Sequence, residues 1–461
     1  MWQPDTITLL FVGALALSVF TTWVLLHKQG GVGMDQPDGF RKRHAQPVSR
    51  LGGVPLIICL IAGYVTLALR QPEFADKWLP ILATNVLIFT VGFLDDLRPL
   101  GAKVKLAGQI GVALVLYALG ISIDVLSSPL GTGSITLGWW SLPLTLAWLV
   151  AIPNIINLID GMDGLATGFG MFLCITLAFI GHFSGFTDIV LMSTVMAGAL
   201  AGFLVFNFPP AKIFLGDGGA YLIGFFVASV SLMSSQKGSI IAGLLVMLVA
   251  LGVPILDTFF AIVRRAIRGV PIFRADAEHI HHRLMVLGFS KAKALVALYS
   301  VCLVLSLLGI SVLWSKGISL PVVGAMVFLL GLGAARYLGY VKSWRSLKTQ
   351  FQNAMLRRQE MLYAGAYTRV LEWEVDRGQS IDDFEKVLTL ALERINIATC
   401  SVSNLVKVSV QVSESTKVYL YHPDEQDAQP LWQAKIDLFY APLSLAYERW
   451  GNESIRLLEH D

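Results

Sequence analysis

The sequence predicts an all-α polytopic membrane protein with about eleven transmembrane helices, followed by a cytoplasmic α+β domain. Two observations point to this fold class. The 461 residues are 55% hydrophobic and only 15% charged, whereas about a quarter of the residues of a soluble protein carry charge. Apolar runs long enough to cross a bilayer recur through most of the chain. A cytosolic enzyme is therefore excluded as a description of the whole protein.

The two parts of the chain differ in charge. Residues 1–344 contain 22 Lys and Arg with 15 Asp and Glu, and residues 345–461 contain 13 and 17. We therefore expect a transmembrane domain over residues 1–344 and a soluble domain over residues 345–461. No basic stripe with interleaved aromatic residues occurs, so nucleic acid is not an expected partner. The four cysteines have no spacing typical of disulfides or of a zinc site.

Eleven apolar stretches are long enough to span a hydrocarbon core of about 30 Å, or ten if one of them is re-entrant. The first has no preceding basic segment and no cleavage site, so it is expected to be a retained helix and not a signal peptide. The expected spans are 7–27, 51–70, 79–94, 104–121, 139–158, 168–183, 188–206, 219–234, 239–264, 291–314 and 318–340.

Positive charge predicts the orientation of these spans. The connections on one side contain 18 Lys and Arg residues, and those on the other side contain four. Because positively charged loops stay in the cytoplasm, the N-terminus is expected outside and the C-terminal domain inside. Several acidic residues then share the cytoplasmic face: Asp95, Asp96, Asp160, Asp163, Asp217, Asp276 and Glu278.

The Asp-Asp motif, Phe93–Pro99, closes the third expected span with two adjacent carboxylates, Asp95 and Asp96. Such a pair at the carboxyl end of a helix opposes the helix dipole and repels itself. It is unfavourable unless a cation or a substrate proton compensates. The motif therefore indicates metal or base chemistry.

The Asn-Asp motif, Asn154–Ala166, follows the fifth expected span. Asn154, Asn157 and Asp160 recur at three-residue spacing, which places them on one helix face. A glycine follows each aspartate of this motif, Asp160 and Asp163, and permits tight turns and close approach of a ligand to the backbone.

The Gly-Asp motif, Phe214–Ala220, opens the eighth expected span. A glycine-rich turn that leads into a helix exposes N–H groups and the positive end of the helix dipole, which suits phosphate. Asp217 in this turn could hold the divalent cation that accompanies a phosphate.

The histidine motif, Glu278–Leu284, contains His279, His281, His282 and Arg283 in the longest and most basic cytoplasmic loop. No cysteine accompanies the histidines, and the nearby arginines favour an anion site over zinc. Asp257 lies within the ninth expected span, which Pro254 is expected to bend because it lacks a backbone N–H donor. An intramembrane carboxylate is unfavourable in lipid and usually functional, so Asp257 is a weaker candidate.

In that order and on one face, FLDDLRPL, NIINLIDGMDGLA, FLGDGGAYLIGF and HIHHRL resemble the polyprenyl-phosphate N-acetylhexosamine-1-phosphate transferase family over roughly residues 40–295. The resemblance implies a bacterial inner-membrane enzyme. It transfers a sugar 1-phosphate from a UDP-sugar to undecaprenyl phosphate, releases UMP and uses Mg²⁺, with Mn²⁺ as an alternative. The HIHHRL pattern is similar to the N-acetylglucosamine branch, which serves O-antigen, common antigen or teichoic acid synthesis. The alternative is the peptidoglycan branch, which uses the muramoyl-pentapeptide nucleotide.

The resemblance also implies roles for individual residues. Asp95 and Asp96 would deprotonate or orient the lipid phosphate, Asp217 would bind the metal, and Lys105 would neutralise phosphate charge. Phe214 could stack on uracil. The polar residues of the Asn-Asp motif would line the nucleotide and metal site, and those of the histidine motif would hold the pyrophosphate: Asn154, Asn157, Asp160 and Asp163, then His279, His281, His282 and Arg283.

Other classes of membrane protein fit less well. A transporter would place acidic residues along a path near the middle of the bilayer, and only Asp257 lies there. A CDP-alcohol phosphotransferase would need a different spacing of aspartates and an Arg that DGMDGLATG lacks. A receptor or scaffold would leave the four motifs unexplained.

The final 117 residues lie outside the resemblance. We expect helices over Arg345–Asp376 and Ile381–Ile395, then strands over Val402–Val412, Lys417–Tyr421 and Trp432–Tyr440. Oligomerisation, docking of a partner and regulation are all compatible with this domain, and a homodimer is compatible with the whole chain.

Overall fold

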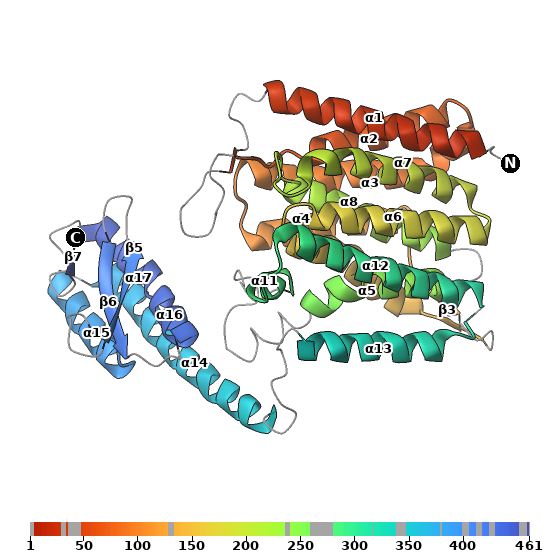
Figure 1. Ribbon diagram of the computed structural model, residues 1–461. Helices are drawn as coiled ribbons and strands as arrows, with labels where there is room; N and C mark the ends of the chain where they lie inside the picture. Colours follow the sequence, from red (N-terminus) through yellow and green to blue (C-terminus); the bar gives the residue numbers. More distant parts are fainter. Residues whose placement is uncertain are drawn as a thin grey trace. The chain divides into compact units, whose positions relative to one another are not determined.

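The computed structural model describes residues 4–28, 34–35, 48–127, 133–235, 240–258, 280–315, 317–337, 347–378, 380–398, 405–411, 417–423, 429–450 and 459–460. The chain forms two compact units. The first takes in residues up to Phe260 and from Asp276 to Tyr340, and the second takes in Val341–Asp461. Figure 1 shows a helix bundle in the first unit and a smaller group of helices and strands in the second.

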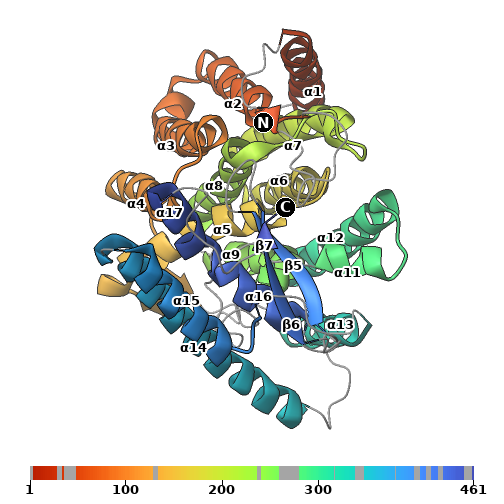
Figure 2. The ribbon, with the colours of Figure 1, turned by 90° about the vertical axis from the view of Figure 1, so that its left-hand side faces the viewer.

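The helices of the first unit run roughly parallel or antiparallel to one another (Figures 1 and 2). Every expected span has a helix at its position in the described part of the chain. The bounds are α1 Pro4–Lys28, α2 Gly53–Ala68, α3 Pro72–Leu97, α4 Ala102–Ala118, α5 Ser141–Ile159, α6 Leu165–Ser184, α7 Thr187–Asn207, α8 Gly216–Ser235, α9 Ile240–Ala250, α11 Ile280–Val286, α12 Lys291–Trp314 and α13 Leu320–Tyr337.

Among the described residues, seven helices are long and apolar enough to cross a membrane. The chain is therefore a polytopic membrane protein. Gly53–Ala68 and Leu320–Ala334 are apolar but shorter, so the total of eleven spans stays a prediction. The seven are Asp5–Lys28, Pro72–Leu97, Gly138–Ile159, Leu165–Ser184, Thr187–Asn207, Gly216–Met233 and Lys291–Trp314.

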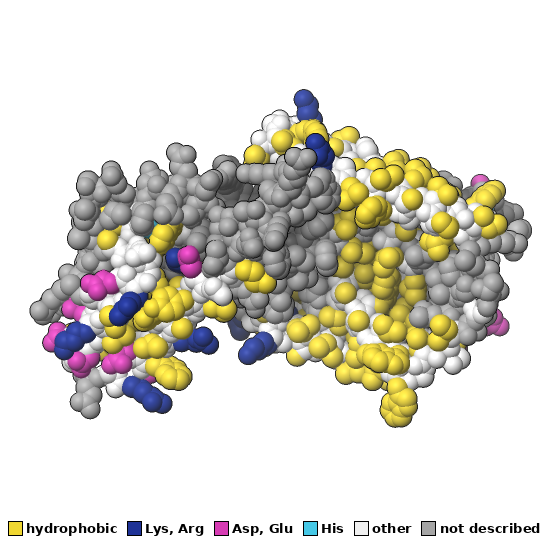
Figure 3. Space-filling model, turned by 90° about the horizontal axis from the view of Figure 1, so that it is seen from below, with side chains coloured by type: hydrophobic (Ala, Val, Ile, Leu, Met, Phe, Trp, Pro, Cys, Tyr) yellow, Lys and Arg dark blue, Asp and Glu magenta, His cyan; other side chains and the backbone are white. Residues whose placement is uncertain are grey.

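Helix α8 lies inside the bundle. Its apolar stretch Gly216–Met233 is completely buried, and it packs against α2, α3, α5, α6 and α9. Peripheral helices instead expose large apolar side chains such as Phe20, Leu87 and Leu307, and Figure 3 shows apolar side chains spread over one face of this unit. An apolar outer surface suits contact with lipid. The enclosed α8 gives its amino end a fixed position among the surrounding helices.

The ninth expected span is not one continuous helix. Helix α9 ends at Ala250, Leu251 is a turn, and helix resumes at residues 252–258; the rest of the expected span 239–264 lies outside the described residues. Pro254 has no N–H, and its ring clashes with the carbonyl group four residues earlier, which belongs to Ala250. The proline thus accounts for the break.

Short strands complete the first unit. The antiparallel pairs are β1 Met34–Asp35 with β2 Val48–Ser49, and β3 Val125–Ser127 with β4 Ser134–Thr136. The 3₁₀ helix Gly138–Trp140 leads into α5.

The second unit combines helices with a three-stranded antiparallel sheet in the order β5-β6-β7. Strands β5 and β6 pair from Leu405 with Pro423 to Gln411 with Lys417. Helix α14 packs against α15, α16 and α17. The bounds are α14 Leu347–Arg377, α15 Ile381–Arg394, β5 Leu405–Gln411, β6 Lys417–Pro423, α16 Gln429–Leu438, α17 Tyr440–Trp450 and β7 Glu459–His460.

The expected strand Trp432–Tyr440 is wrong, because this segment forms most of helix α16 and the start of α17. Its buried residues Trp432, Ile436 and Phe439 recur at spacings of four and three. That spacing places them on one face of a helix. The apolar content of the segment is therefore explained by a buried helical face and not by strand alternation.

Candidate active site at the amino end of α8

Asp96 joins the Asp-Asp motif to the Gly-Asp motif. Its carboxylate, at the end of α3, accepts the N–H of Asp217 at 2.9 Å and the N–H of Gly218 at 2.8 Å. The first N–H groups of a helix have no partner inside the helix, and a carboxylate is a good acceptor for them. Both oxygens of the buried Asp96 are thus engaged in fastening α3 to the start of α8.

Close packing of backbones makes this junction possible. A Cβ atom at Gly92 would lie 2.5 Å from the carbonyl oxygen of Asp217, which no real side chain tolerates. Gly216, at the start of α8, has a φ of +75° and lies against the carbonyl group of Arg50. Glycine adopts this conformation without a steric penalty. Because neither glycine has a side chain, α3, α8 and the backbone at residue 50 can come into contact.

Asp217 is the centre of the site. Its Oδ2 lies 3.0 Å from Nζ of Lys105 on α4, and its Oδ1 accepts the amide of Asn157 on α5 at 2.9 Å. The same Lys105 also donates to Oδ2 of Asp95 at 3.0 Å. The second oxygen of Asp95 accepts the N–H of Leu100. One lysine therefore bridges two carboxylates from motifs that lie far apart in the sequence.

Arg50 is a site residue that the sequence reasoning missed. Its guanidinium lies 3.8 Å from Asp217 Oδ1 and 3.8 Å from Asp96 Oδ1, and its side chain is 37% exposed. Backbone bonds hold the segment in place, because Phe214 donates to Ser49 at 2.8 Å and Gly52 donates to Phe214 at 3.0 Å. The available signal was a basic residue directly before Leu51-Gly52-Gly53.

Asp160, next to the end of α5, is partly buried close to these carboxylates. Burial, followed by the negative charges of Asp217 and Asp96, raises the pKa of Asp160 well above its ordinary value. Asp163 has different partners. Its Oδ2 accepts the N–H of Ala211 at 3.3 Å and lies 3.5 Å from Nζ of Lys291. Asp163 therefore ties the Asn-Asp turn to neighbouring segments, whereas Asp160 belongs to the carboxylate group.

Two other expected residues lie beside the centre of the site. The amide of Asn154 exchanges hydrogen bonds with Gln109 of α4, and Asn154 also donates to Val150 O at 2.7 Å. The side chain of Phe214 is partly buried at the turn before α8. The structure thus brings Asn157 to Asp217 directly, while Asn154 supports α4, which carries Lys105.

The histidine motif is described only in part. His279 lies outside the described residues, and the side chains of His281 and His282 are also outside them. The backbone of His281, His282 and Arg283 belongs to helix α11. The first residue of that helix, Ile280, donates its N–H to Oδ1 of Asp257 at 3.0 Å. Asp257 is thus connected to the histidine motif in this structure.

The sequence of this chain matches known proteins. A model of glycosyl transferase family 4 matches residues 78–235. A probable undecaprenyl-phosphate N-acetylglucosaminyl 1-phosphate transferase of Bacillus subtilis is 34% identical over 329 residues, which is 70% of this chain and 90% of that protein. The chain belongs to glycosyl transferase family 4. It is a membrane transferase.

Two further relatives of this chain have names that state different substrates. A decaprenyl-phosphate N-acetylglucosaminephosphotransferase of Mycobacterium tuberculosis is 35% identical over 286 residues, covering 56% of this chain and 70% of that protein. A phospho-N-acetylmuramoyl-pentapeptide-transferase of Halalkalibacterium halodurans is 30% identical over 322 residues, covering 66% and 95%. The family 4 match itself spans the Asp-Asp, Asn-Asp and Gly-Asp motifs.

The donor set of this family 4 site fits a hard divalent cation. Among the residues that the structure describes, no three His, Cys, Asp or Glu side chains form a ready metal-binding group. Mg²⁺ usually takes only one or two carboxylates and completes its shell with water and substrate phosphates. Asp217, with Asp160 nearby, would supply those carboxylates. Burial is the main cause of the raised pKa of Asp160, and the negative charges of Asp217 and Asp96 add to it.

Proposed function

We propose that this chain transfers N-acetylglucosamine 1-phosphate, or a close N-acetylhexosamine relative, from a UDP-sugar to a polyprenyl phosphate, with Mg²⁺ as cofactor. The observation that carries the proposal is the environment of Asp217. Its carboxylate meets an ammonium, a guanidinium and an amide that come from three separate segments. All three groups can donate to phosphate oxygens.

Charge balance supports a reaction between two phosphates. Among the described residues, four carboxylates gather here, those of Asp95, Asp96, Asp160 and Asp217, and the ion pairs of this group involve two cations, Arg50 and Lys105. Two anionic substrates would add more negative charge. Phosphoryl transfer depends mainly on positioning and on neutralising such charge. A divalent cation beside the protein cations would offset this added charge.

The proposed reaction forms one P–O bond and breaks one. An oxygen of the lipid phosphate attacks the phosphorus that bears the sugar, and the bond from that phosphorus to the bridging oxygen breaks. UMP leaves with the bridging oxygen, and the product is a polyprenyl diphosphate sugar. When bound, the metal neutralises charge on the transferred phosphoryl group.

Lys105 and Arg50 would bind the substrate phosphates. Lys105 contacts Oδ2 of Asp217, and Arg50 lies near Oδ1 of the same carboxylate. Both side chains are partly exposed, 23% for Lys105 and 37% for Arg50. Phosphate oxygens can therefore reach them from the open side of the site. Asp217 would hold the metal next to these phosphates.

Asp96 is better explained as a positioning residue than as a base. Both of its oxygens accept backbone N–H groups at the start of α8. Asp95 points its carboxylate at Lys105 instead, so it would orient the lysine toward phosphate. A proton on the lipid phosphate would pass to an ionised carboxylate of the site such as Asp95.

The donor preference is supported by the relatives. Those named for N-acetylglucosamine are 34% and 35% identical, and the one named for the muramoyl pentapeptide is 30% identical. The histidine motif HIHHRL agrees with this choice. The bacterial relatives support an inner-membrane protein. The distribution of Lys and Arg supports a site and a C-terminal unit that face the cytoplasm.

The test uses purified full-length protein with undecaprenyl phosphate, Mg²⁺ and either UDP-N-acetylglucosamine or the UDP-muramoyl pentapeptide. We expect UMP and a lipid-linked sugar only with the first donor, detected by mass spectrometry. Product from the pentapeptide nucleotide alone would assign the chain to the other branch. No product with either donor, from a monodisperse protein, would overturn the proposed substrates.

A further inference from the structure

Asp257 lies where the helix after α9 meets the histidine motif. The carboxylate is only 5% exposed, and its Oδ1 accepts the N–H of Ile280 at 3.0 Å. A buried carboxylate is strongly unfavourable unless it is paired or hydrogen-bonded. The bond to Ile280 therefore matters to both of the segments that it joins.

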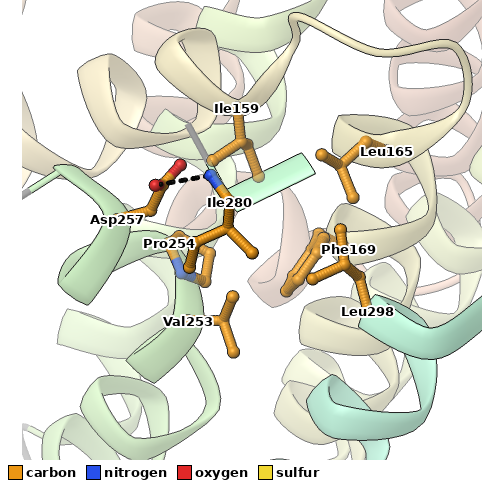
Figure 4. A pocket seen from close by; sticks show the side chains of 8 residues that line it. All are labelled: Ile159, Leu165, Phe169, Val253, Pro254, Asp257, Ile280 and Leu298. Carbon is orange, nitrogen blue, oxygen red and sulfur yellow. Dashed lines mark hydrogen bonds between the residues drawn. The ribbon is translucent and has the colours of Figure 1, made fainter. Parts of the chain in front are cut away.

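The surroundings of this bond are apolar. Figure 4 shows Asp257, Pro254 and Val253 on one side of a small pocket, with Ile280 directed into it. Ile159 and Leu165 form part of the same lining. These two residues flank the turn that carries Asp160 and Asp163, so Ile280 at the start of α11 lines the same pocket as both ends of that turn.

Helix α11 is short, and among its described residues Leu284 packs in the core while Ile280 bonds Asp257. It is seven residues long, Ile280–Val286, and so short a helix is not stable by itself in water. Its first N–H groups have no partner within the helix. The acceptor at its first residue therefore fixes the amino end of the helix, while Leu284 and the contact with α12 hold the rest of it.

We propose that Asp257 is a positioning residue, which holds the amino end of α11, and with it the described backbone of the histidine motif, near the Asp160–Gly164 turn. This inference rests on the proposed function in one respect: the histidine motif is taken to contact the donor pyrophosphate. In this arrangement the helix that resumes after α9 supplies the acceptor, and α11 begins at the pocket that Ile159 and Leu165 also line.

The first measurement is independent of activity. In full-length protein, backbone hydrogen exchange is followed by mass spectrometry in peptides that cover residues 280–286, with peptides of α12 as an internal reference. Asp257→Leu should speed exchange there by about tenfold to a hundredfold, which corresponds to about 1.4 to 2.7 kcal/mol at 1.36 kcal/mol per decade. Asp257→Asn keeps an acceptor oxygen and should restore much of the protection.

The matched control is Thr258→Val. Thr258 is a buried neighbour on the same helical turn, and the substitution keeps the shape of the side chain. It should leave exchange in 280–286 unchanged. If Asp257→Leu does not insert in the membrane, Asp257→Ala makes the same comparison with a smaller side chain. Unchanged exchange in whichever variant folds would overturn the proposal.

The second measurement separates positioning from a direct catalytic role. With UDP-N-acetylglucosamine as donor, kcat/KM should fall about tenfold to a hundredfold in Asp257→Leu and recover largely in Asp257→Asn. The Mg²⁺ concentration at half-maximal activity should not change, because Asp217 is untouched. Equal loss of activity in both variants, with normal exchange, would contradict positioning. An inactive wild type would refute the proposed function instead, and the exchange result would still decide this inference.

Discussion

Gly92→Ala tests whether the contact between α3 and α8 sets the catalytic geometry. A Cβ atom at position 92 would lie 2.5 Å from the carbonyl oxygen of Asp217, whereas ordinary contacts begin at 3.4 Å. The start of α8 must therefore move by roughly 0.9 Å relative to α3. A misplacement of about 1 Å can lower a rate by about a hundredfold. We expect kcat to fall by about that factor, in a protein that still inserts.

The assay is UMP release by the full-length protein, together with its thermal unfolding temperature. Gly111→Ala is the matched control, because Gly111 is also in a helix and has nothing within 4 Å of the added Cβ. Helix propensity alone makes either substitution favourable by up to about 1 kcal/mol. Wild-type turnover and an unchanged or higher unfolding temperature in Gly92→Ala would refute the argument from close packing.

Three further predictions follow from the site. Asp217→Asn should lower turnover at least tenfold, because it removes the charge that faces Lys105 and Arg50, and charge-assisted bonds are worth about 1.5–3 kcal/mol; full turnover with unchanged metal dependence would contradict it. Because the pKa of Asp160 is raised, the folded protein keeps a proton that the unfolded chain loses at lower pH. Without divalent cations, the free energy of unfolding should therefore fall as pH rises from the ordinary carboxyl range toward the raised pKa. Asp160→Asn should flatten this dependence in thermal unfolding measured against pH. Deletion of residues 345–461 should leave kcat within a few-fold, because that segment lies in a separate compact unit and none of the described site contacts involves it; complete loss in a monodisperse, inserted protein would show that the unit completes the site.

Helix positions in the membrane unit could be predicted from the sequence because an apolar run of this length has few alternatives in lipid. Motif positions could be predicted for a related reason. Once basic residues assigned the connections to one face, Asp95, Asp96, Asp160 and Asp217 had to lie near the same membrane surface. The structure adds that Asp96 bonds the backbone of α8 while Asp95 meets Lys105, a difference that two adjacent aspartates do not reveal.

Arg50 was missed because its role depends on a contact between distant segments. It was one basic residue among many on its side of the membrane, and the backbone contacts of Ser49 and Gly52 with residues 213–214 bring it to Asp217. Pro254 indicated a bend in the ninth expected span, but apolar content did not predict that the helix would end at Ala250 and resume at residue 252. Trp432–Tyr440 was misjudged because a short apolar run fits either a strand or one face of a helix.

The described carboxylates of the site outnumber the two cations that pair with them. Lys105 bridges Asp95 and Asp217, and Arg50 lies between Asp96 and Asp217. These pairs keep the carboxylates apart without making Asp217 inaccessible, since both cations remain partly exposed. Phosphate oxygens compete with Asp217 for the same two cations. Each oxygen of Asp217 that they free is an oxygen that a divalent cation can take, so phosphate and metal favour the same rearrangement. An acidic site is therefore compatible with two anionic substrates, because its negative charge is balanced by groups that the substrates themselves attract.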